Sequence, residues 1–460
     1  MKGPLSRRFS IDSTRNHTHP ANAMIVTVTP RFLSGKIPAI ASKSYAHRLL
    51  IAAALSESPA HVSCSTRSED IDATCRVLRG LSARVTQGNA GDADVLPIDR
   101  DHLPVLPEVD CGESGTTLRY LIPVAAALGC GAKFICRGRL PSRPVEPLAG
   151  ELKRHGIRLT TLPGEGFVVE GKLAPGAYSL PGNVSSQFIG GLLYALAILE
   201  GTSTLAITKG FESEPYVRMT LEVLEAAGVA IREEKGPEGL PVWTVAGRGK
   251  LHAGPELVVE GDWSNAAFWL AAGALAGDEG ETIEVTGIRR DSLQGDRAVA
   301  EILARFGARV IQTESATSVM SALPGALRGI EIDAAQIPDL VPILAVVAGA
   351  ASGTTRFTNA GRLRIKESDR LKSTSALLSL LGVPHEEEPA GLVVHGLGSA
   401  GKFRGGEIQG FGDHRIVMAA AVAAASGGAH VRISGAEAFR KSYPKFLEDF
   451  AKLGGLCSAE

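Results

Sequence analysis

Six long apolar segments recur along the chain, and each is opened by a short loop rich in glycine and polar residues. The first reads SKSYAHRLLIAAAL and the second GESGTTLRYLIPVAAAL. Each apolar run is long enough for a helix that is buried on every side. The six segments start 70 to 79 residues apart, at Ser42, Gly112, Gly182, Gly261, Ile337 and Gly412. Such regular spacing indicates a repeated structural unit.

A second helical pattern alternates with the first. Segments such as LKRHGIRL and LEAAGVAI place an amphipathic helix before a glycine, and residues typical of a strand follow. A glycine just past a helix end adopts the left-handed conformation that terminates the helix. The pattern predicts six α/β units, with Gly156, Gly228, Gly307, Gly382 and Gly454 at this position and Ser82 in their place in the first unit.

Six units divide naturally into two domains of three. The last unit is short, because only 49 residues run from Gly412 to the C-terminus, and the strand-like stretch from Ile25 to about Ile40 has no unit of its own. We expect this stretch to complete the sixth unit. One domain would then comprise residues 24–40 plus 258–460 and the other residues 41–257. The two chain crossings would form a hinge that lets the domains close on a ligand.

Composition excludes several classes of function. The 48 basic residues nearly balance the 49 acidic ones, so no overall charge points to nucleic acid or an anionic membrane. No apolar run approaches the ~18 residues of a membrane span. The six cysteines form no CxxC pair, and reduced thiols in a cytoplasmic protein are expected. Residues 1–23 are polar and basic, and we expect a disordered extension there.

The loops that open the apolar helices carry the candidate chemistry. A helix N-terminus presents free N–H groups and a partial positive charge, so it attracts phosphate and carboxylate groups. Serine and aspartate at such positions are usually only capping residues, but a cap does not require lysine or arginine. The polar residues of these loops are Lys43, Ser44, Arg48, Gly115, Thr116, Arg119, Ser185, Ser186, Gln187, Asp339, His414 and Arg415. Several such loops around one cleft would form a site for a polyanion.

Two further segments extend this set. LRIKESDRL contains Lys366, Glu367 and Arg370, and RGRLPSRP contains Arg139 and Arg143. The first is also compatible with an ion-pair ladder on a helix and the second with a surface turn. Walker and HExxH patterns are absent, so we expect no cofactor and no metal.

At this point the chain resembles the EPSP synthase family of enolpyruvyl transferases, from about residue 25 to 455. The resemblance is carried by SKSYAHR, GESGTTLRYL, SRPVEPL, NVSSQF, SEPYVRMTL, EGDWSNAAF, LQGD, IPDLVPIL, RIKESDRL, GDHRIVMA and KSYPKF, all in order. It implies an α/β fold of two domains, each built from three βαβαββ units around a central cleft. It also implies transfer of the enolpyruvyl group of phosphoenolpyruvate to the 5-hydroxyl of shikimate 3-phosphate.

The resemblance also implies the ligand contacts. Those expected for phosphoenolpyruvate are Lys43, Gly115, Arg143, Gln187, Arg370, Arg415 and Lys441. Those expected for shikimate 3-phosphate are Lys43, Ser44, Arg48, Thr116, Ser185, Ser186, Gln187, Ser213, Tyr216, Asp339 and Lys366. Arginine can grip carboxylate and phosphate groups through two parallel hydrogen bonds.

The implied reaction is addition followed by elimination of phosphate, with Lys43, Asp339, Glu367 and His414 as the catalytic candidates. Asp339 is a reasonable base for the hydroxyl, whereas Glu367 or Lys43 could serve the proton at C3. A side chain at the position of Gly115 is associated with glyphosate resistance in this family. We therefore expect glyphosate to compete with phosphoenolpyruvate, and the enzyme to be a monomer that binds neither nucleic acid nor membrane.

Three positions depart from the better-known members: Glu113 and Ser114 replace Asn and Ala, and Arg362 stands where some members have Asn. An anionic Glu113 would be unfavourable near a phosphate site unless it points away or pairs with a cation. Two alternatives remain open. The sister enzyme that acts on UDP-N-acetylglucosamine uses a reactive cysteine in a mobile loop, whereas Cys136 ends an apolar run. A non-catalytic anion-binding homologue would be expected to have lost its acid and base residues.

Overall fold

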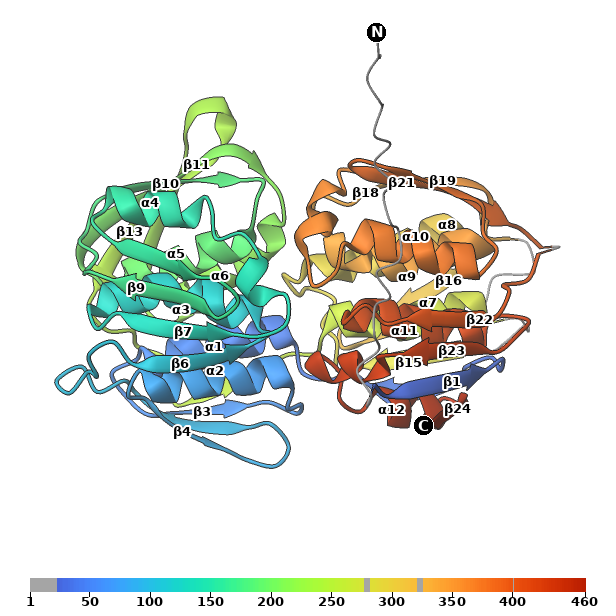
Figure 1. Ribbon diagram of the computed structural model, residues 1–460, viewed down its shortest axis with the longest axis horizontal. Coiled ribbons are helices and arrows are strands. Elements are labelled where there is room, and N and C mark those ends of the chain that lie inside the picture. Colours follow the sequence, from blue (N-terminus) through green and yellow to red (C-terminus); the bar gives the residue numbers. More distant parts are fainter. Residues whose placement is uncertain (1–22, 277–281, 321–325, 400) are drawn as a thin grey trace, which may run out of the picture.

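The strands of this protein form six four-stranded sheets, arranged in two lobes that lie side by side (Figure 1). They are seen in a computed structural model that describes residues 23–276, 282–320, 326–399 and 401–460. The expected extension at residues 1–23 therefore lies almost wholly outside the described residues. In every sheet the first two strands of the unit are parallel, and the fourth lies antiparallel between the second and third. This common order is the predicted repeat, a βαβαββ unit.

The first lobe, blue to green in Figure 1, holds three of the units. The first comprises β14 (Glu256–Val258), α1 (Lys43–Ala54), β3 (Ala60–Ser63), α2 (Glu69–Gly80), β4 (Arg84–Gln87) and β5 (Ala93–Leu96). The second comprises β6 (Glu108–Gly112), α3 (Gly115–Leu128), β7 (Ala132–Cys136), α4 (Leu148–Arg154), β8 (Arg158–Leu162) and β9 (Gly166–Glu170). The third comprises β10 (Ala177–Gly182), α5 (Ser186–Ala197), β11 (Glu200–Phe211), α6 (Glu214–Ala226), β12 (Ala230–Lys235) and β13 (Pro241–Arg248).

The second lobe holds the other three units. The fourth comprises β2 (Gly35–Pro38), α7 (Trp263–Leu275), β15 (Thr282–Thr286), α8 (Val299–Phe306), β16 (Arg309–Gln312) and β17 (Ala316–Met320). The fifth comprises β18 (Glu331–Asp333), α9 (Val341–Ala350), β19 (Ser352–Thr358), α10 (Arg370–Leu380), β20 (His385–Glu388) and β21 (Gly391–Leu397). The sixth comprises β22 (Gly406–Gln409), α11 (His414–Ala425), β23 (Val431–Ser434), α12 (Phe446–Lys452), β24 (Leu456–Ala459) and β1 (Ile25–Thr29).

The N-terminal stretch serves two sheets, which corrects one expectation. β1 lies between β23 and β24 and so completes the sixth unit, as predicted. β2, by contrast, pairs in parallel with β15 and provides the first strand of the fourth unit. The prediction placed both strands in the sixth unit because the chain length of a unit does not reveal which sheet has a free edge. β14 similarly returns to the first unit, where it pairs with β3.

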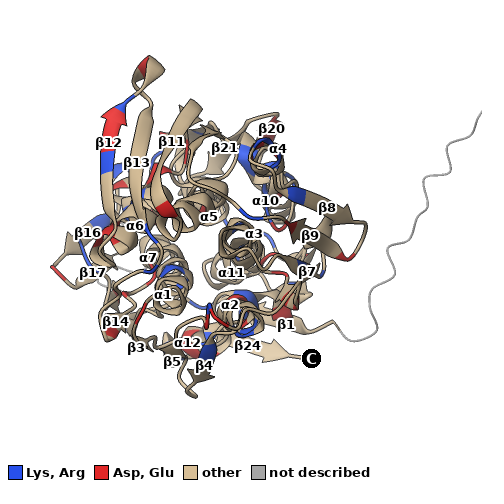
Figure 2. Ribbon diagram, turned by 90° about the vertical axis from the view of Figure 1, so that its left-hand side faces the viewer, with Lys and Arg blue, Asp and Glu red and all other residues tan. Residues whose placement is uncertain are grey.

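Each lobe encloses its own hydrophobic core. The helices α1, α3 and α5 are buried along most of their length and lie inside the first lobe, with the sheets around them (Figure 2). One core takes its residues from positions 41–259 and the other from positions 26–40 and 263–453. On this basis we propose two domains close to the predicted ones, residues 41–257 and residues 24–40 plus 258–460, but with the second crossing after Val259. Val258 pairs with Ser63, and Val259 lies in the core of the first lobe.

The left-handed helix ends are confirmed at all six predicted positions. φ is 80° at Gly156, 80° at Gly228, 110° at Gly307, 74° at Gly382 and 92° at Gly454. Ser82 adopts the same region, with φ 74°, although a side chain is disfavoured there. Its Oγ donates a hydrogen bond to the carbonyl oxygen of Asp99 at 3.0 Å, which offsets part of that strain.

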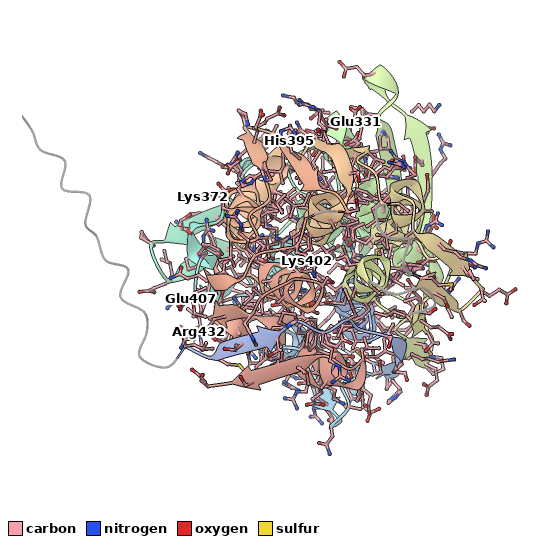
Figure 3. The ribbon with its side chains drawn as sticks, turned by 90° about the vertical axis from the view of Figure 1, so that its right-hand side faces the viewer. Glu331, Lys372, His395, Lys402, Glu407 and Arg432 are labelled. Carbon is pink, nitrogen blue, oxygen red and sulfur yellow. The ribbon has the colours of Figure 1, made fainter. Side chains whose placement is uncertain are left out.

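The outer faces of the sheets carry charged residues. On the second lobe, Arg432 of β23 pairs with Glu407 of β22 across neighbouring strands, with Nη1 and Oε1 3.2 Å apart (Figure 3). These partly exposed pairs contribute little stability. Within the described part of the chain, no helix is both long and apolar enough to cross a membrane.

Candidate active site

A polar cleft lies where the helix starts of both lobes meet. Its walls include residues from the start of all six apolar helices: Lys43, Gly115, Ser186, Asp262, Asp339 and His414. Asp339 lies in the 3-10 turn that precedes α9. Five of these helices have a side-chain cap, for example Ser114 Oγ, which accepts from Thr117 N. The repeat therefore directs six helix N-termini, each with a partial positive charge, at one cavity.

The structure brings the candidate residues together, with two exceptions, Lys441 and Arg139. Arg139 Nη1 donates to the carbonyl oxygen of Glu367 at 3.2 Å, so Arg139 lies beside the cleft. The cleft is lined by Lys43, Ser44, Arg48, Gly115, Thr116, Arg143, Ser185, Ser186, Gln187, Ser213, Tyr216, Asp339, Lys366, Glu367, Arg370, His414 and Arg415. Lys441 is not among the lining residues. Its Nζ donates to Glu113 Oε2 at 2.7 Å and to the carbonyl oxygen of Gly412 at 2.9 Å, so it lies beside the cleft.

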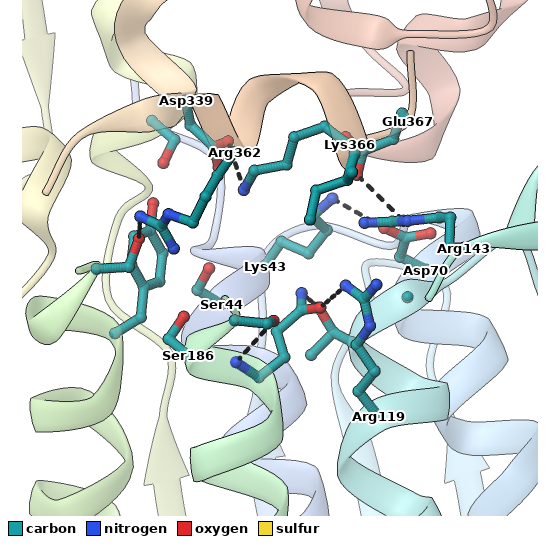
Figure 4. A pocket seen from close by; sticks show the side chains of 18 of the residues that line it. Lys43, Ser44, Asp70, Arg119, Arg143, Ser186, Asp339, Arg362, Lys366 and Glu367 are labelled. Atoms are coloured by element: carbon teal, nitrogen blue, oxygen red, sulfur yellow. Dashed lines mark hydrogen bonds and ion pairs between the residues drawn. The ribbon is translucent and has the colours of Figure 1, made fainter. Parts of the chain in front are cut away.

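Asp339 is the centre of a charged cluster (Figure 4). Its carboxylate accepts from Arg370 Nη1 at 2.6 Å and from Arg415 Nη2 at 3.0 Å, and Lys366 Nζ lies 3.5 Å away. Burial alone would raise its pKa, but these three cations hold the pKa well below the usual range. Asp339 is therefore ionised, and its present partners must move before it can act as a base.

Glu367 forms the second acidic group of the cleft. It accepts from Arg370 Nη2 at 2.5 Å, and Arg143 Nη1 lies 3.9 Å from its other oxygen. Burial opposes ionisation, yet Arg370 and Arg143 lower the pKa of this carboxyl well below its ordinary value. Arg370 is itself fixed by Asp413, which accepts from its Nε at 2.8 Å.

Lys43 and His414 have opposite charge states. Burial alone would lower the pKa of Lys43, but the carboxylate of Asp70, 2.8 Å from Nζ, raises it above its usual value. Burial, together with the charges of Lys43 and Arg415, lowers the pKa of His414 well below its ordinary value. Lys43 is thus a protonated ammonium group, whereas His414 is a neutral imidazole whose two nitrogens have no protein partner within the described residues.

A series of hydrogen bonds between side chains crosses the first lobe. Arg119 Nη1 donates to Gln187 Oε1 at 2.8 Å, and Gln187 Nε2 donates to Thr116 Oγ1 at 2.8 Å. Gly115 lies beside these hydrogen-bonded side chains, and there is little free space around its Cα atom. A Cβ atom there would lie 2.8 Å from Arg143 Nη1, which is closer than non-bonded atoms approach. Glycine at this position therefore allows Arg143 its place in the cleft.

The departures from the family pattern have structural partners. Glu113 pairs with Lys441 across the two lobes, which satisfies the condition stated for an acidic residue at this position. Arg362 lines the cleft and pairs through Nε with Glu212, while its Nη2 donates to Ser213 Oγ at 2.9 Å. Cys136, the position compared with the sister enzyme, is buried at the end of β7.

Sequence reasoning missed several acidic residues of this region, among them Asp262, which caps α7 in the cleft wall. Asp70 lines the cleft and pairs with Lys43. Asp296 is fully buried behind the cleft, and its Oδ2 accepts from Tyr216 Oη at 3.2 Å and from Ser264 Oγ. Asp296 belongs to the recognised LQGD motif, which could have indicated it, whereas Asp70 looks like an ordinary acidic residue in the first turn of α2.

The cleft is suited to the binding of anions by cations and helix ends. It supplies a protonated lysine, several arginines and ionised carboxylates, which together can bind two anionic groups and move protons between them. Among the described residues, no group of three or more His, Cys, Asp or Glu side chains could hold a metal ion.

Comparison with known proteins is consistent with this geometry. A family model described as EPSP synthase (3-phosphoshikimate 1-carboxyvinyltransferase) matches residues 28–450. The 3-phosphoshikimate 1-carboxyvinyltransferase of Clostridium kluyveri is 38% identical over 431 residues, which cover 94% of this chain and 97% of the relative. That of Clostridium acetobutylicum is 39% identical over 434 residues, with the same coverage.

Solved structures of enolpyruvyl transferases have a fold similar to that of this chain. An EPSP synthase from Acinetobacter baumannii superposes with a TM-score of 0.77 at 25% identity, and the match covers 95% of this chain and 100% of that one. The enolpyruvyl transferase NikO from Streptomyces tendae has a TM-score of 0.76 at 20% identity, over 95% and 99% of the two chains. The second likeness concerns the fold alone.

Proposed function

The chain belongs to the EPSP synthase family, and we propose that its cleft transfers the enolpyruvyl group of phosphoenolpyruvate to the 5-hydroxyl of shikimate 3-phosphate, with release of phosphate. The observation that carries the proposal is the meeting of six helix N-termini with cations from both lobes in one cleft. Both substrates are polyanions, and such a site binds them without a metal ion. The family and the relatives make the protein an enzyme of this class.

Phosphoenolpyruvate would bind on the side of the cleft formed by Arg143, Arg370, Arg415, Gln187 and Gly115. Arg370 and Arg415 can each offer a planar fork to a carboxylate or phosphate. In the ligand-free protein these forks are occupied by Asp339 and Glu367. Substrate anions would exchange with those carboxylates, so binding and activation of the acidic groups would occur together. Lys441 would join this side once it releases Glu113.

Shikimate 3-phosphate would bind against the first lobe. Hydroxyl groups of Ser44, Ser185, Ser186 and Ser213 line the cleft there, with Arg48, Thr116 and Tyr216 in the same wall. Lys366 would contact the ligand from the second lobe. Asp339 then accepts the proton of the attacking 5-hydroxyl. Its pKa rises when its arginine partners turn to the substrate, because loss of a nearby cation makes a carboxylate more basic.

The chemistry is an addition followed by an elimination. In the addition, the 5-hydroxyl oxygen bonds to C2 of phosphoenolpyruvate while C3 gains a proton. In the elimination, the tetrahedral adduct loses phosphate from C2 and a proton from C3, which restores the vinyl group. Lys43 carries a proton in the resting cleft, whereas Glu367 is ionised, so we assign the proton delivered to C3 to Lys43. His414 lies close enough to Lys43 and Glu367 for their charges to act on its pKa, which Lys43 lowers and Glu367 raises.

The decisive experiment is phosphate release from phosphoenolpyruvate with two alternative acceptors. Shikimate 3-phosphate should support release and UDP-N-acetylglucosamine should not, and Asp339→Ala and Lys43→Met should each lower kcat by at least about 100-fold. Arg356→Gln, an exposed arginine of β19 outside the cleft, is the control. Release with the nucleotide sugar alone would move the protein to the sister activity, and binding without turnover would leave a non-catalytic homologue.

Glyphosate should inhibit in competition with phosphoenolpyruvate. Support comes from Gly115, since a side chain there would displace Arg143 from the expected phosphoenolpyruvate side. Gly115→Ala should therefore raise both the inhibition constant of glyphosate and the KM for phosphoenolpyruvate in steady-state assays. We further propose that the protein is cytoplasmic and that it is a monomer. Size-exclusion chromatography with light scattering would test the oligomeric state. A dimer would contradict the proposed monomer.

A further inference from the structure

Arg362 is a cation of the cleft wall that the reaction scheme above does not use. It lies on the short 3-10 turn Gly361–Ile365 of the second lobe and reaches across to the first lobe. Its Nε pairs with Glu212, and its Nη2 donates to Ser213 Oγ at 2.9 Å and to the carbonyl oxygen of Ala335 at 2.8 Å. The side chain is only 12% exposed, and burial lowers the pKa of its guanidinium, although it remains charged.

Cations line both sides of the cleft, and Lys366, Arg370 and Arg415 gather around Asp339 (Figure 4). Arg143, Arg119 and Lys43 lie toward one side, close to Asp70 and Glu367. Arg362 lies on the opposite side, above Ser186 and Ser44. A cleft with cations on both sides is suited to two anionic partners, or to one acceptor whose anionic group is remote from the reacting bond.

Ser213 links Arg362 to the hydroxyl groups of that side. Ser213 has a left-handed backbone, with φ 53°, and its N–H donates to the carbonyl oxygen of Ala335 in the other lobe at 3.0 Å. Arg362 contacts the same carbonyl and the Ser213 hydroxyl. The strained serine is therefore held where its Oγ and the guanidinium can face one ligand group together.

We propose that Arg362 determines specificity by binding the phosphate group of the acceptor, together with the hydroxyls of Ser186 and Ser213. This inference rests on the proposed function, because it concerns the acceptor of that reaction. Serine hydroxyls supply hydrogen bonds but no charge, and Lys366 of the proposed contacts, whose Nζ lies 3.5 Å from Asp339, supplies a single point charge. An arginine at the same place supplies charge and a planar pair of donors, which is the arrangement that favours a phosphate group over a neutral hydroxyl.

Glu212 fits this role as the partner of Arg362 in the ligand-free protein. A buried guanidinium without an anion would be costly. Glu212 neutralises it until the phosphate arrives, and the phosphate then shares or replaces this carboxylate. Glu212 is 27% exposed at the side chain, so water can solvate it after such an exchange.

The test is equilibrium binding of two ligands, shikimate 3-phosphate and unphosphorylated shikimate, without phosphoenolpyruvate. Arg362→Gln should raise the Kd for shikimate 3-phosphate about 10- to 100-fold, the range expected for a charge-assisted hydrogen bond, and change the Kd for shikimate less than about 3-fold. Arg362→Lys should give an intermediate Kd and keeps the test usable if the glutamine variant does not fold. Equal weakening of both ligands, or weakening of neither, would overturn the proposal.

A double-mutant cycle separates direct binding from support of Ser213. If Arg362 contacts the phosphate, Arg362→Gln still weakens shikimate 3-phosphate about 10-fold or more in a Ser213→Ala background. If it acts only by holding Ser213, the second substitution adds no loss and the proposal is wrong. Arg356→Gln, which breaks an exposed pair with Glu388, is the matched control and should alter neither Kd.

Turnover distinguishes this inference from the proposed function. The wild-type protein could release no phosphate and yet prefer shikimate 3-phosphate over shikimate, with Arg362→Gln abolishing that preference. This result would refute the proposed transfer and retain the phosphate site. Normal turnover in Arg362→Gln, with unchanged Kd values for both ligands, would retain the proposed transfer and refute the role of Arg362 at the phosphate.

Discussion

Single residues of the cleft owe their charge states to their immediate partners. Lys43 is held protonated by Asp70, since Asp70 outweighs the effect of burial on the lysine. The same reasoning applies to Asp339 and Glu367, whose ionisation depends on surrounding arginines. These charges follow from side-chain distances of 2.5 to 3.5 Å, within a unit for Lys43 and Asp70 and between units for Arg415 and Asp339. A sequence does not give such distances.

The pair of Lys43 and Asp70 leads to a pH prediction. Asp70→Asn removes the carboxylate that raises the pKa of Lys43 and leaves burial, which lowers it. If Lys43 delivers a proton, the alkaline limb of the kcat profile should move to lower pH, because the lysine deprotonates earlier. A pH–rate series with saturating substrates measures this shift. An unchanged alkaline limb, with only a uniform loss of rate, would contradict the role of Lys43.

Asp296 leads to a stability prediction. Burial first, and then the charge of Asp339, raise its pKa from 3.8 to about 6. Between these values the folded protein binds more protons than the unfolded chain, so stability falls as the pH rises from about 4 to about 6 and the cost persists above that. Asp296→Asn removes this titration. Relative to wild type, its free energy of unfolding should rise by up to about 3 kcal/mol between pH 4 and pH 7.5.

Urea denaturation at both pH values measures the difference. A difference that does not change with pH would show that Asp296 is ionised in the fold at little cost. Asp101→Asn, at an exposed loop position, is the control for loss of a carboxylate without burial.

At the scale of the element, the repeat depends on helix ends as much as on apolar helices. All six amphipathic-helix copies turn out of the helix through a left-handed residue, five of them through glycine. That turn directs the following strand back along its sheet. Ser82 shows that the conformation is imposed by the unit, because the chain adopts it even where a Cβ atom opposes it.

Gly156 tests the cost of such a turn in isolation. It has φ 80°, and a Cβ atom there would meet nothing within 4 Å, so alanine would add backbone strain without a steric clash. Gly156→Ala should lower the free energy of unfolding by about 1–2 kcal/mol. Gly254→Ala is the matched control, because the nearest atom would be 3.9 Å away and the backbone is not left-handed. Chemical denaturation of both variants should show a loss only at Gly156.

At the scale of the whole molecule, the cleft exists because the two lobes face each other. Residues of both lobes line it, and pairs such as Lys441 with Glu113 and Arg362 with Glu212 connect them. The two hydrophobic cores are nevertheless separate. A ligand that contacts the cleft walls of both lobes should therefore stabilise both hydrophobic cores.

Calorimetry with shikimate 3-phosphate tests this coupling. At about 100 times its Kd, a ligand adds about 2.7 kcal/mol to the stability of the structure that binds it. We expect every unfolding transition to move to higher temperature. A shift confined to one of two transitions would place the ligand on a single lobe.

The sequence alone determined the repeat, the buried helices, the helix ends and the family, because these depend on local patterns of apolar residues, glycines and capping groups. Even the departures at Glu113 and Arg362 were visible in it. Only the tertiary structure decided that β2 joins the fourth unit, that Asp70 pairs with Lys43, and that Lys441 meets Glu113. Each of these joins segments far apart in the chain, and side-chain charge states follow from such contacts through distance and burial, which no local pattern encodes.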